Sequence, residues 1–218
     1  MNASLAGRRV LVSAGPTYED IDPVRFIGNR SSGKMGFAIA AAAARAGAET
    51  VLVAGPVRLP TPAGVHRIDV RSAAQLREAV LAALPADAYV SAAAVADWTP
   101  REIAPGKLKK QPGVDTFTLE LVRTADVLAE VAVHPLRPRL VLGFAAETGD
   151  VEANARAKLA AKRIDFIAAN QVGVEGSGFE SDDNALAVIG HDSLRRLGPA
   201  PKTELAQALI ELIAERLS

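Results

Sequence analysis

The sequence predicts an α/β fold in which a mostly parallel sheet carries helices on both faces. Segments with the pattern of strands alternate with segments with the pattern of helices along the chain. Alanine runs are frequent and aromatic residues make up only 4% of the sequence, a mix that suits helices packed closely on a sheet. With 218 residues, 49% of them hydrophobic, we expect a single domain over residues 1–218, with a substantial core and a flap.

Four strands and two helices are predicted in the first half of the chain. The run from Arg9 to Ala14 contains β-branched residues and ends at a Gly-Pro pair, which is typical of a buried strand. Gly47 is a common type of helix end, and Ser72 is a suitable helix N-cap. In chain order the prediction is a strand at 9–14, a polar loop at 17–32, a helix at 33–46, strands at 50–54 and 67–70, a helix at 72–84 and a strand at 88–94.

A flap is predicted at about residues 99–122, where the alternation of strands and helices is interrupted. Residues 100–112 contain proline, glycine and three lysines without periodicity, which is typical of a mobile loop. Residues 116–122 alternate like a half-exposed strand. After the flap the sequence predicts a helix near 124–132, a strand at 140–144, a helix at 151–162, a strand at 165–169, an antiparallel final strand at 186–189 and an amphipathic helix at 202–217.

The charge balance and the lack of cysteine argue against several classes of function. Lys and Arg number 25, as do Asp and Glu, so no overall charge favours nucleic acid or an anionic membrane. The sequence has no cysteine, which excludes disulfides, thiolate nucleophiles and thiolate metal sites. Residues 1–9 lack the apolar core of a signal peptide and no apolar stretch reaches spanning length, so we expect a soluble, cytoplasmic protein.

Candidate binding residues follow the first predicted strand, because ligands of parallel sheets bind beyond the carboxyl ends of the strands. The sequence there is neither the phosphate loop GxxxxGK[ST] nor GxGxxG. Ser32 and Gly33 open a helix. Either the free N–H groups at the start of this helix bind an anion, or the two residues only cap the helix. Arg25 can bind a carboxylate or phosphate with two hydrogen bonds, and Asn29 can donate to an oxygen that gains negative charge during a reaction. A surface ion pair for Arg25 and a turn for Asn29 are the structural alternatives.

Small residues and an acid follow the strand predicted at 88–94. Residues 91–96 (SAAAVA) would let a flat base or a ligand approach the main chain closely. Asp97 comes next and has three candidate roles: binding a base amino group, facing Lys107, or serving a bound metal ion. As an alternative, Asp97 caps a helix or forms a turn.

Lysines at two further places are candidates for phosphate binding. Lys107, with Lys109 and Lys110 on the flap, would neutralise phosphates and leave with them when the flap opens. Lys158 and Lys162 are four residues apart, hence on one helix face, and would reach a triphosphate. A solvated surface is the alternative for both groups.

No side chain is predicted to act as a nucleophile. The histidines at 66, 134 and 191 have no metal-ligand spacing and no paired carboxylate, so they receive no catalytic role. The GxSxG signature is absent. The chemistry that remains is positioning and charge neutralisation.

Several motifs together resemble one family, the phosphopantothenate–cysteine ligases of coenzyme A biosynthesis. They are GPTYEDIDPVRFIGNRSSGKMG, AAVADW, KLKK, GFAAET, the lysine-bearing helix and AANQV followed by SDDNA, in that order over nearly the whole chain. The resemblance implies a Rossmann-like three-layer domain and a homodimer with exchanged flap strands. It also implies that CTP and Mg²⁺ activate 4'-phosphopantothenate as an acyl-cytidylate with release of pyrophosphate, and that L-cysteine then displaces CMP.

The same resemblance implies roles for particular residues. Asn29 would position the reacting acyl phosphate with Arg25 in the same loop, and Lys107 would serve the intermediate from the flap. Substrate would contact Arg25, Asn29, Ser32 and Gly33. Mg²⁺ would be held mainly by the nucleotide phosphates, with Asp97 as a candidate ligand. The nucleotide would be bound by Ser91, Ala92, Ala93, Ala94, Ala96, Asp97, Lys107, Ala125, Asp126, Val127, Leu128, Phe144, Lys158 and Lys162.

The sequence departs from this family pattern in some places and leaves alternatives open. Bacterial members are usually fused behind a flavin-dependent decarboxylase. The given sequence does not include one, so the chain is either a stand-alone enzyme or an excised C-terminal domain. Gly28 and Ala125 stand where the family pattern would have a small polar residue and a proline. A dinucleotide-dependent reductase would need a glycine fingerprint after the first strand, where GPTYE stands instead. A nucleotide-binding homologue without catalysis is the other alternative, and residue types alone do not choose CTP over ATP.

Overall fold

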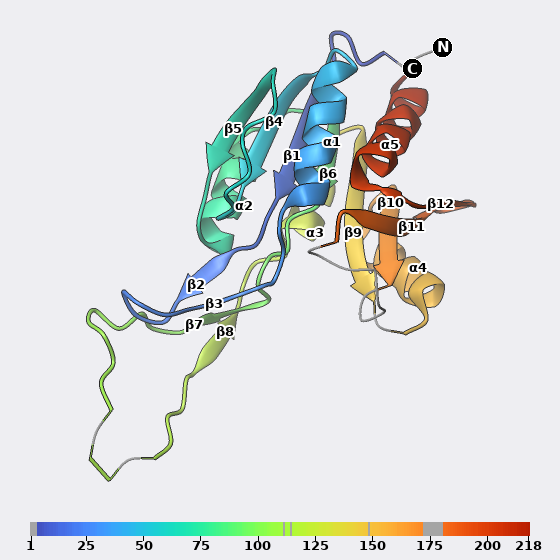
Figure 1. Ribbon diagram of the computed structural model, residues 1–218. Coiled ribbons are helices and arrows are strands. Elements are labelled where there is room, and N and C mark those ends of the chain that lie inside the picture. The colour runs from blue at the N-terminus through green and yellow to red at the C-terminus, as the bar shows by residue number, and fades with distance from the viewer. Residues whose placement is uncertain (1–3, 111, 114, 148, 172–180) are drawn as a thin grey trace.

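An eight-stranded sheet forms the centre of the protein (Figure 1). The computed structural model describes residues 4–110, 112–113, 115–147, 149–171 and 181–218. The strands of this sheet are β1 (Arg9–Ala14), β4 (Glu49–Ala54), β5 (Val65–Asp69), β6 (Ala88–Ser91), β9 (Leu140–Glu147), β10 (Phe166–Gln171), β11 (Asp183–Gly190) and β12 (Ser193–Pro201).

The strand order is β12-β11-β10-β9-β6-β1-β4-β5. The six strands from β10 to β5 pair in parallel, and β11 and β12 add an antiparallel edge. This is a doubly wound order: the chain moves from β1 outwards to β5, then returns and adds β6 on the other side of β1. The direction of winding reverses between β1 and β6, and an isolated bridge between Pro16 and Ala94 continues this pair. Ligands of such sheets bind at this reversal, beyond the carboxyl ends of the strands.

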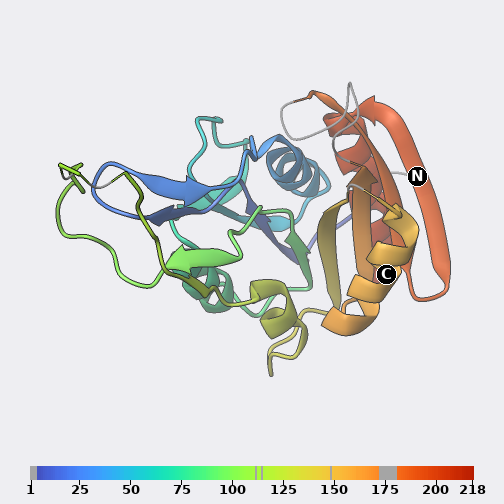
Figure 2. The ribbon, with the colours of Figure 1, turned by 90° about the horizontal axis from the view of Figure 1, so that it is seen from below.

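Helices cover both faces of the sheet, as predicted (Figure 2). On one face α1 (Lys34–Arg45) packs against α5 (Lys202–Leu217). On the other lie α2 (Ala73–Ala82), α3 (Val127–Ala132) and α4 (Val151–Lys162). Each layer has its own apolar cluster against the sheet. None of the helices in the described part of the chain is long and apolar enough to cross a membrane.

Small residues bring α1 close to the sheet at the reversal point. A Cβ atom on Gly36 would lie 2.4 Å from the Cβ of Ala14 and 3.4 Å from that of Ala92. At Gly36, helix α1 therefore rests directly on the carboxyl end of β1 and beside Ala92, which follows β6. This contact places the start of the helix beside the segment that follows β6.

A projecting arm, residues 18–28, 98–110, 112–113 and 115–123, extends from the carboxyl end of the sheet (Figure 1). It contains two antiparallel ribbons, β2 (Tyr18–Asp20) with β3 (Phe26–Gly28), and β7 (Trp98–Pro100) with β8 (Leu121–Arg123). The rings of Tyr18 and Phe26 stack with centroids 3.9 Å apart and join the first ribbon across its strands. Strands β2 and β7 are in contact, so the two ribbons form one unit.

Most predicted elements are confirmed, and the capping box that Ser72 forms with Gln75 starts α2. The strand predicted at 116–122 is wrong for most of its length, because only Leu121 and Val122 belong to β8. The apolar alternation there has no sheet face to cover, and Phe117 is exposed. The polar loop at 17–32 contains the ribbon β2–β3, whose three-residue strands are too short to show a period.

The strand predicted at 186–189 is not the last of the sheet. It lies within β11, and β12 follows as the edge strand. Strand β12 has no fully buried residue, so its sequence lacks the hydrophobic alternation that predicts strands.

Candidate active site

A cleft of two adjoining lobes lies beyond the carboxyl ends of the sheet strands. The first lobe has a volume of about 500 Å³ and lies between the segment after β6 and helices α3 and α4. The second has a volume of about 260 Å³ and lies between that segment and the start of α1. The residues shared by the two lobes are Ala93, Val95, Asp97, Phe144 and Lys158. The cleft is therefore continuous and occupies the position expected for a ligand of a doubly wound sheet.

The first lobe brings together most of the predicted nucleotide-binding residues. Small side chains of the segment after β6 form its floor, and two lysines of α4 form one wall. Members of this group are separated by up to about 70 positions in the sequence. The predicted residues that line the lobe are Ser91, Ala93, Asp97, Ala125, Asp126, Val127, Leu128, Phe144, Lys158 and Lys162.

Asp126 and Lys162 form an ion pair in the wall of this lobe. Asp126 caps α3 by accepting a hydrogen bond from the Ala129 N–H at 3.1 Å, and Lys162 Nζ donates to its carboxylate at 2.8 Å. Partial burial opposes ionisation of Asp126, but the hydrogen bonds from Lys162 and Ala129 and the charges of Lys162 and Lys158 bring its pKa below the usual value. Among the described residues no carboxylate forms a salt bridge with Lys158, so that ammonium is available to a ligand.

Asp97 is placed where both lobes meet, and it is exposed to solvent. Its backbone oxygen accepts a hydrogen bond from the Thr124 N–H at 3.0 Å, which ties the segment after β6 to the start of the α3 region. No salt bridge to its carboxylate is found among the described residues. The described part of the chain contains no cluster of three or more His, Cys, Asp or Glu side chains that would hold a metal ion by themselves.

The second lobe contains the other predicted residues of this region. Ser32, Gly33, Ala92 and Ala94 line it. Gly33 has φ of 76° and is the N-cap of α1, and no side chain caps this helix end. Gly33 therefore caps the helix, in line with the structural alternative, and anion binding by Ser32 and Gly33 stays a prediction.

Asn29 lies on the rim of the cleft. Its side-chain amide donates a hydrogen bond to the Ala94 oxygen at 2.9 Å, directly beside the Pro16–Ala94 bridge. This bond fixes the side chain near the second lobe although Asn29 belongs to the loop after β3. Its second amide N–H is left for another acceptor.

Besides Asn29, which contacts Ala94 but lines neither lobe, three predicted residues do not line the cleft. Ala96 is buried behind it, where its N–H donates to Thr17 Oγ1 at 3.0 Å and its oxygen accepts from Thr124 Oγ1 at 2.6 Å. Lys107 is exposed on the arm and lines neither lobe. Arg25 also belongs to the arm.

Asp22 joins Arg25 to the segment that carries Lys107. Its buried carboxylate accepts hydrogen bonds from the Val24 and Arg25 N–H groups at 2.8 and 2.9 Å, from the Arg25 guanidinium, and from the Leu108 N–H at 3.1 Å. Arg25 in turn donates to the Leu108 oxygen at 2.9 Å. The arm thus holds Arg25 and Lys107 as one group, away from the cleft of the same chain.

Sequence reasoning missed several residues that line the cleft. Trp98 and Arg123 border the first lobe, with the guanidinium 5.6 Å from the ring centroid. Asn170, Asn184 and Lys202 border the second lobe. The first pair comes from the ribbon β7–β8, and the others from strand or helix ends that show no local signal for a ligand.

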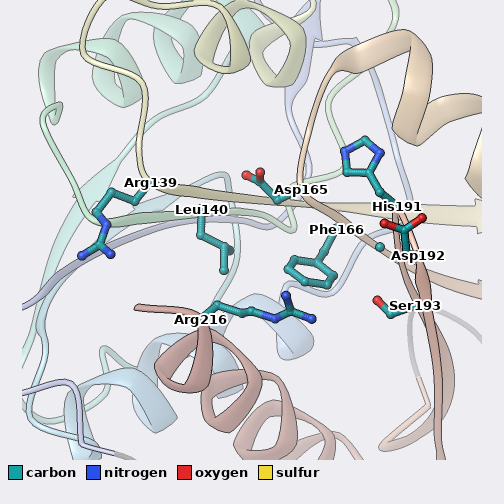
Figure 3. Close-up of a pocket in the computed structure, with 9 residues that line it drawn as sticks. Arg139, Leu140, Asp165, Phe166, His191, Asp192, Ser193 and Arg216 are labelled. Carbon is teal, nitrogen blue, oxygen red and sulfur yellow. The ribbon is translucent and has the colours of Figure 1, made fainter. Parts of the chain in front are cut away.

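A different pocket, of about 420 Å³, lies at the opposite end of the sheet (Figure 3). It is lined by the first residues of β9 and β10, and the Arg216 guanidinium stands 5.2 Å from the centroid of the Phe166 ring. His191 and Asp192 border it from the turn after β11 (Figure 3). No predicted site residue lines this pocket, which fits its position at the amino ends of the strands.

Comparisons with known proteins agree on one family. The family model described as DNA/pantothenate metabolism flavoprotein C-terminal domain matches residues 5–217. The coenzyme A biosynthesis bifunctional protein CoaBC of Vibrio cholerae is 48% identical over 214 residues, which cover 98% of this chain and 54% of that protein. The protein of the same name in Bacillus subtilis is 45% identical over 216 residues, covering 98% of this chain and 52% of that protein.

A solved structure shows the same architecture. The crystal structure of the C-terminal domain of the coenzyme A biosynthesis bifunctional protein CoaBC has a TM-score of 0.82 and 36% sequence identity. The match covers 99% of this chain and 97% of that one. The chain spans about half the length of the curated relatives it matches.

Proposed function

The chain belongs to the family of DNA/pantothenate metabolism flavoprotein C-terminal domains, and from this membership we propose that it is a phosphopantothenate–cysteine ligase of coenzyme A biosynthesis. In this proposal CTP activates the carboxylate of 4'-phosphopantothenate, and L-cysteine then forms the amide. The observation that supports it best is the continuous cleft at the reversal of the sheet, which gathers Asp97, Phe144 and Lys158 from three separate segments.

The reaction needs activation because a carboxylate is a poor acceptor for an amine. The carboxylate oxygen would attack the α-phosphorus of CTP, and pyrophosphate would leave. The cysteine nitrogen would then attack the acyl carbon, CMP would leave with the bridging oxygen, and the ammonium proton would pass to solvent. No protein nucleophile is required, in keeping with the lack of cysteine and of a GxSxG signature.

The protein's part would be to position the reactants and neutralise charge. Lys158 and the pair Asp126–Lys162 stand in the wall of the first lobe, where the nucleotide would lie. Asn29, held by the Ala94 oxygen, would aim its free amide N–H at the acyl phosphate. Electrostatic stabilisation by prearranged donors is the main means by which enzymes accelerate such phosphoryl chemistry.

Mg²⁺ is the cofactor that we propose. This ion is usually held by one or two carboxylates together with substrate phosphates. Asp97 fits that donor set, because its exposed carboxylate stands at the junction of the lobes and no described residue forms a salt bridge with it. When bound there, the ion would neutralise charge on the phosphates of the nucleotide.

We further propose a homodimer formed through the projecting arm. Among the described residues, six of the eight large hydrophobic side chains that are exposed belong to the arm. Two-stranded ribbons such as β2–β3 and β7–β8 are marginally stable alone, so burial against a second copy would stabilise them. Exchange of flap strands would bring Arg25 and Lys107 of one subunit to the cleft of the other, which accounts for their distance from the cleft of their own chain.

We propose that residues 1–218 work as one cytoplasmic ligase domain with its flap at about 99–122. The curated relatives are named bifunctional proteins, and the flavin-dependent decarboxylase is the second activity that we expect in the full-length protein.

A pyrophosphate-release assay tests this function. The purified chain is given CTP, ATP, GTP or UTP with Mg²⁺, and 4'-phosphopantothenate and cysteine are each present or omitted. We expect release with CTP that requires phosphopantothenate, and steady turnover only when cysteine is added. Release that is indifferent to phosphopantothenate contradicts the activation step, and a change in nicotinamide absorbance would favour a reductase instead.

A further inference from the structure

The second lobe of the cleft has the properties of an anion site built from three parts of the fold. One wall is the start of α1, with Ser31, Ser32 and Gly33. The facing wall is formed by Asn184 and Lys202, at the start of β11 and of α5. The lobe opens to the first lobe at Phe144 and Lys158, so a ligand in one extends into the other.

Asn184 lines this lobe with a side chain that carries an amide. The residue is only 8% exposed, and its Oδ1 accepts a hydrogen bond from the Ala185 N–H at 2.9 Å. That backbone donor fixes the orientation of the amide, since only the oxygen can accept. Among the described residues no group accepts a hydrogen bond from its Nδ2. Asn184 lines the lobe, so this donor is available to a ligand there.

Lys202 adds a buried positive charge to the same wall. It is 6% exposed, and its Nζ donates to the Ser181 oxygen. Lys34, on the opposite wall, pairs with Asp182 at 2.7 Å. Burial lowers the pKa of Lys202, the nearby charge of Lys34 lowers it further, and Asp182 and Asp183 oppose this shift. An anion in the lobe would favour the charged form of the lysine.

Helix α1 contributes its positive end. The helix has 12 residues, its first turn carries no acidic side chain, and no side chain caps it. Most helices place an acid or a capping oxygen at this position, because both complement the helix dipole and the free N–H groups. The helix begins with Lys34, and in the described part of the chain no acid of the first turn complements its dipole, so an anion in the lobe would do so.

We propose that the second lobe binds a phosphoryl group and that Asn184 and Lys202 are its binding residues. The lobe is lined by a helix end, an amide side chain and a lysine, a set that suits a tetrahedral group with several oxygens. The proposal rests on the ligase function, which offers two sources of this group: the β- and γ-phosphates of the nucleotide, which leave as pyrophosphate, and the phosphate monoester of phosphopantothenate.

Inorganic pyrophosphate, titrated calorimetrically into the protein, is the direct probe. Asn184→Asp keeps the acceptor for the Ala185 N–H and replaces the donor with a negative charge, while Lys202→Met keeps the length of the side chain without its charge. We expect each to weaken pyrophosphate binding by about tenfold or more, since charge-assisted hydrogen bonds are lost. Lys202→Arg should restore part of the affinity. Arg195→Met, an exposed charge on β12, is the control and should bind as the wild type does.

Steady-state kinetics identify the source of the phosphoryl group. A raised KM for CTP with weaker product inhibition by pyrophosphate assigns the lobe to the nucleotide. A raised KM for 4'-phosphopantothenate, together with a weaker affinity for that substrate in calorimetry, assigns the lobe to the phosphate monoester. Two folded variants that bind pyrophosphate and both substrates as the wild type does would overturn the proposal.

The ligase function and this site fail in different ways. A wild-type chain that binds pyrophosphate through Asn184 but forms no product from CTP, phosphopantothenate and cysteine would refute the ligase and leave the anion site intact. Normal turnover in both variants with unchanged affinities would refute the site alone.

Discussion

At the scale of single residues, the candidate site is a set of charges whose surroundings differ. Lys162 is neutralised by Asp126, whereas Lys158 and Asp97 form no salt bridge with any described residue. A ligand can therefore bind Lys158 and Asp97 without first breaking a salt bridge. The residue-scale predictions therefore concern Asp97, Lys158, Lys107 and Asp22.

Asp97→Ala and Lys158→Ala should each weaken use of the nucleotide without unfolding the chain. Loss of one charged contact to a base or phosphate should cost about 1.5–3 kcal/mol of transition-state binding. Initial rates across CTP concentrations, with thermal melts alongside, measure the effect. If both variants fold normally and keep the wild-type dependence on CTP, the two residues belong to the solvated surface.

Lys107→Gln should form the acyl-cytidylate and stall before the amide. Lys107 is exposed on the arm, so its loss should change stability by less than about half a kcal/mol. Its expected role is to meet negative charge on the intermediate during the second step. Mass detection of the intermediate after rapid quenching, with cysteine present, tests this. If the variant turns over as fast as the wild type, Lys107 has no role in the second step. If the variant fails to bind CTP, Lys107 belongs to the nucleotide site.

Asp22→Asn should lose stability in a pH-dependent way. The Arg25 guanidinium and three backbone N–H groups hold the pKa of Asp22 well below its usual range, although burial opposes this. Since the folded pKa lies below the unfolded value of about 3.9, the contribution is full above about pH 5 and is lost as the pH falls further. Urea denaturation of both proteins from pH 3 to pH 7 should show a difference that shrinks at low pH. An equal difference at both ends of this range would contradict it.

At the scale of elements, the contact between α1 and the end of β1 decides the shape of the cleft. Gly36 lets the helix approach so closely that a Cβ has no room. Helix α1 thereby brings its amino end to the second lobe, beside the segment that follows β6.

Gly36→Ala should therefore destabilise the fold although alanine favours helices. The added Cβ would meet the main-chain-bound Cβ of Ala14 at 2.4 Å. Overpacking of this kind costs about 1–3 kcal/mol, while helix propensity returns up to about 1 kcal/mol, so we expect a net loss of about 1 kcal/mol. The midpoint of urea denaturation measures it. The matched control is Gly106→Ala, where no atom lies within 4 Å of the new Cβ and the change should be small. A variant at Gly36 as stable as the wild type would disprove the close contact.

At the scale of the whole molecule, the arm carries the apolar surface that the proposed dimer would bury. Ile103 and Phe117 are 61% and 68% exposed, and both belong to the loop between β7 and β8. The loop carries the Lys107 segment, which Asp22 fastens to the rest of the arm. A second copy that covers Ile103 and Phe117 would also contact Lys107.

Ile103→Asp and Phe117→Asp should each dissociate the dimer and lower turnover together. A charge in a buried apolar interface costs several kcal/mol, whereas on a free surface it costs little. Sedimentation equilibrium and the pyrophosphate assay at the same concentrations measure both effects. Val133→Asp, at a residue that is 63% exposed outside the arm, is the control and should stay dimeric and active. A wild-type chain that is monomeric and fully active would refute the proposed dimer.

The sequence by itself determined the layers and much of their order. Helices α4 and α5 begin and end at the predicted residues, and Ser72 caps α2 as expected, because periodicity and caps act over a few neighbouring residues. It also placed Asn29, Asp97 and Lys158 as candidates, the first two because parallel strands end in ligand-binding loops and the last because of its helix face. The specific chemistry came from the resemblance of whole motifs.

Only the tertiary structure decided which of these residues meet. The sheet order sets β6 beside β1 and β9, so Asp97 and Lys158 share a lobe although they are 61 positions apart. The same order brings Asn184 and Lys202 to the start of α1, and neither has a local pattern that signals a ligand. Edge strand β12 has no fully buried residue, and the strands of the arm are only three residues long, so no hydrophobic alternation marks them in the sequence. Contacts between distant segments are set by packing and pairing across the sheet, which a local pattern does not encode.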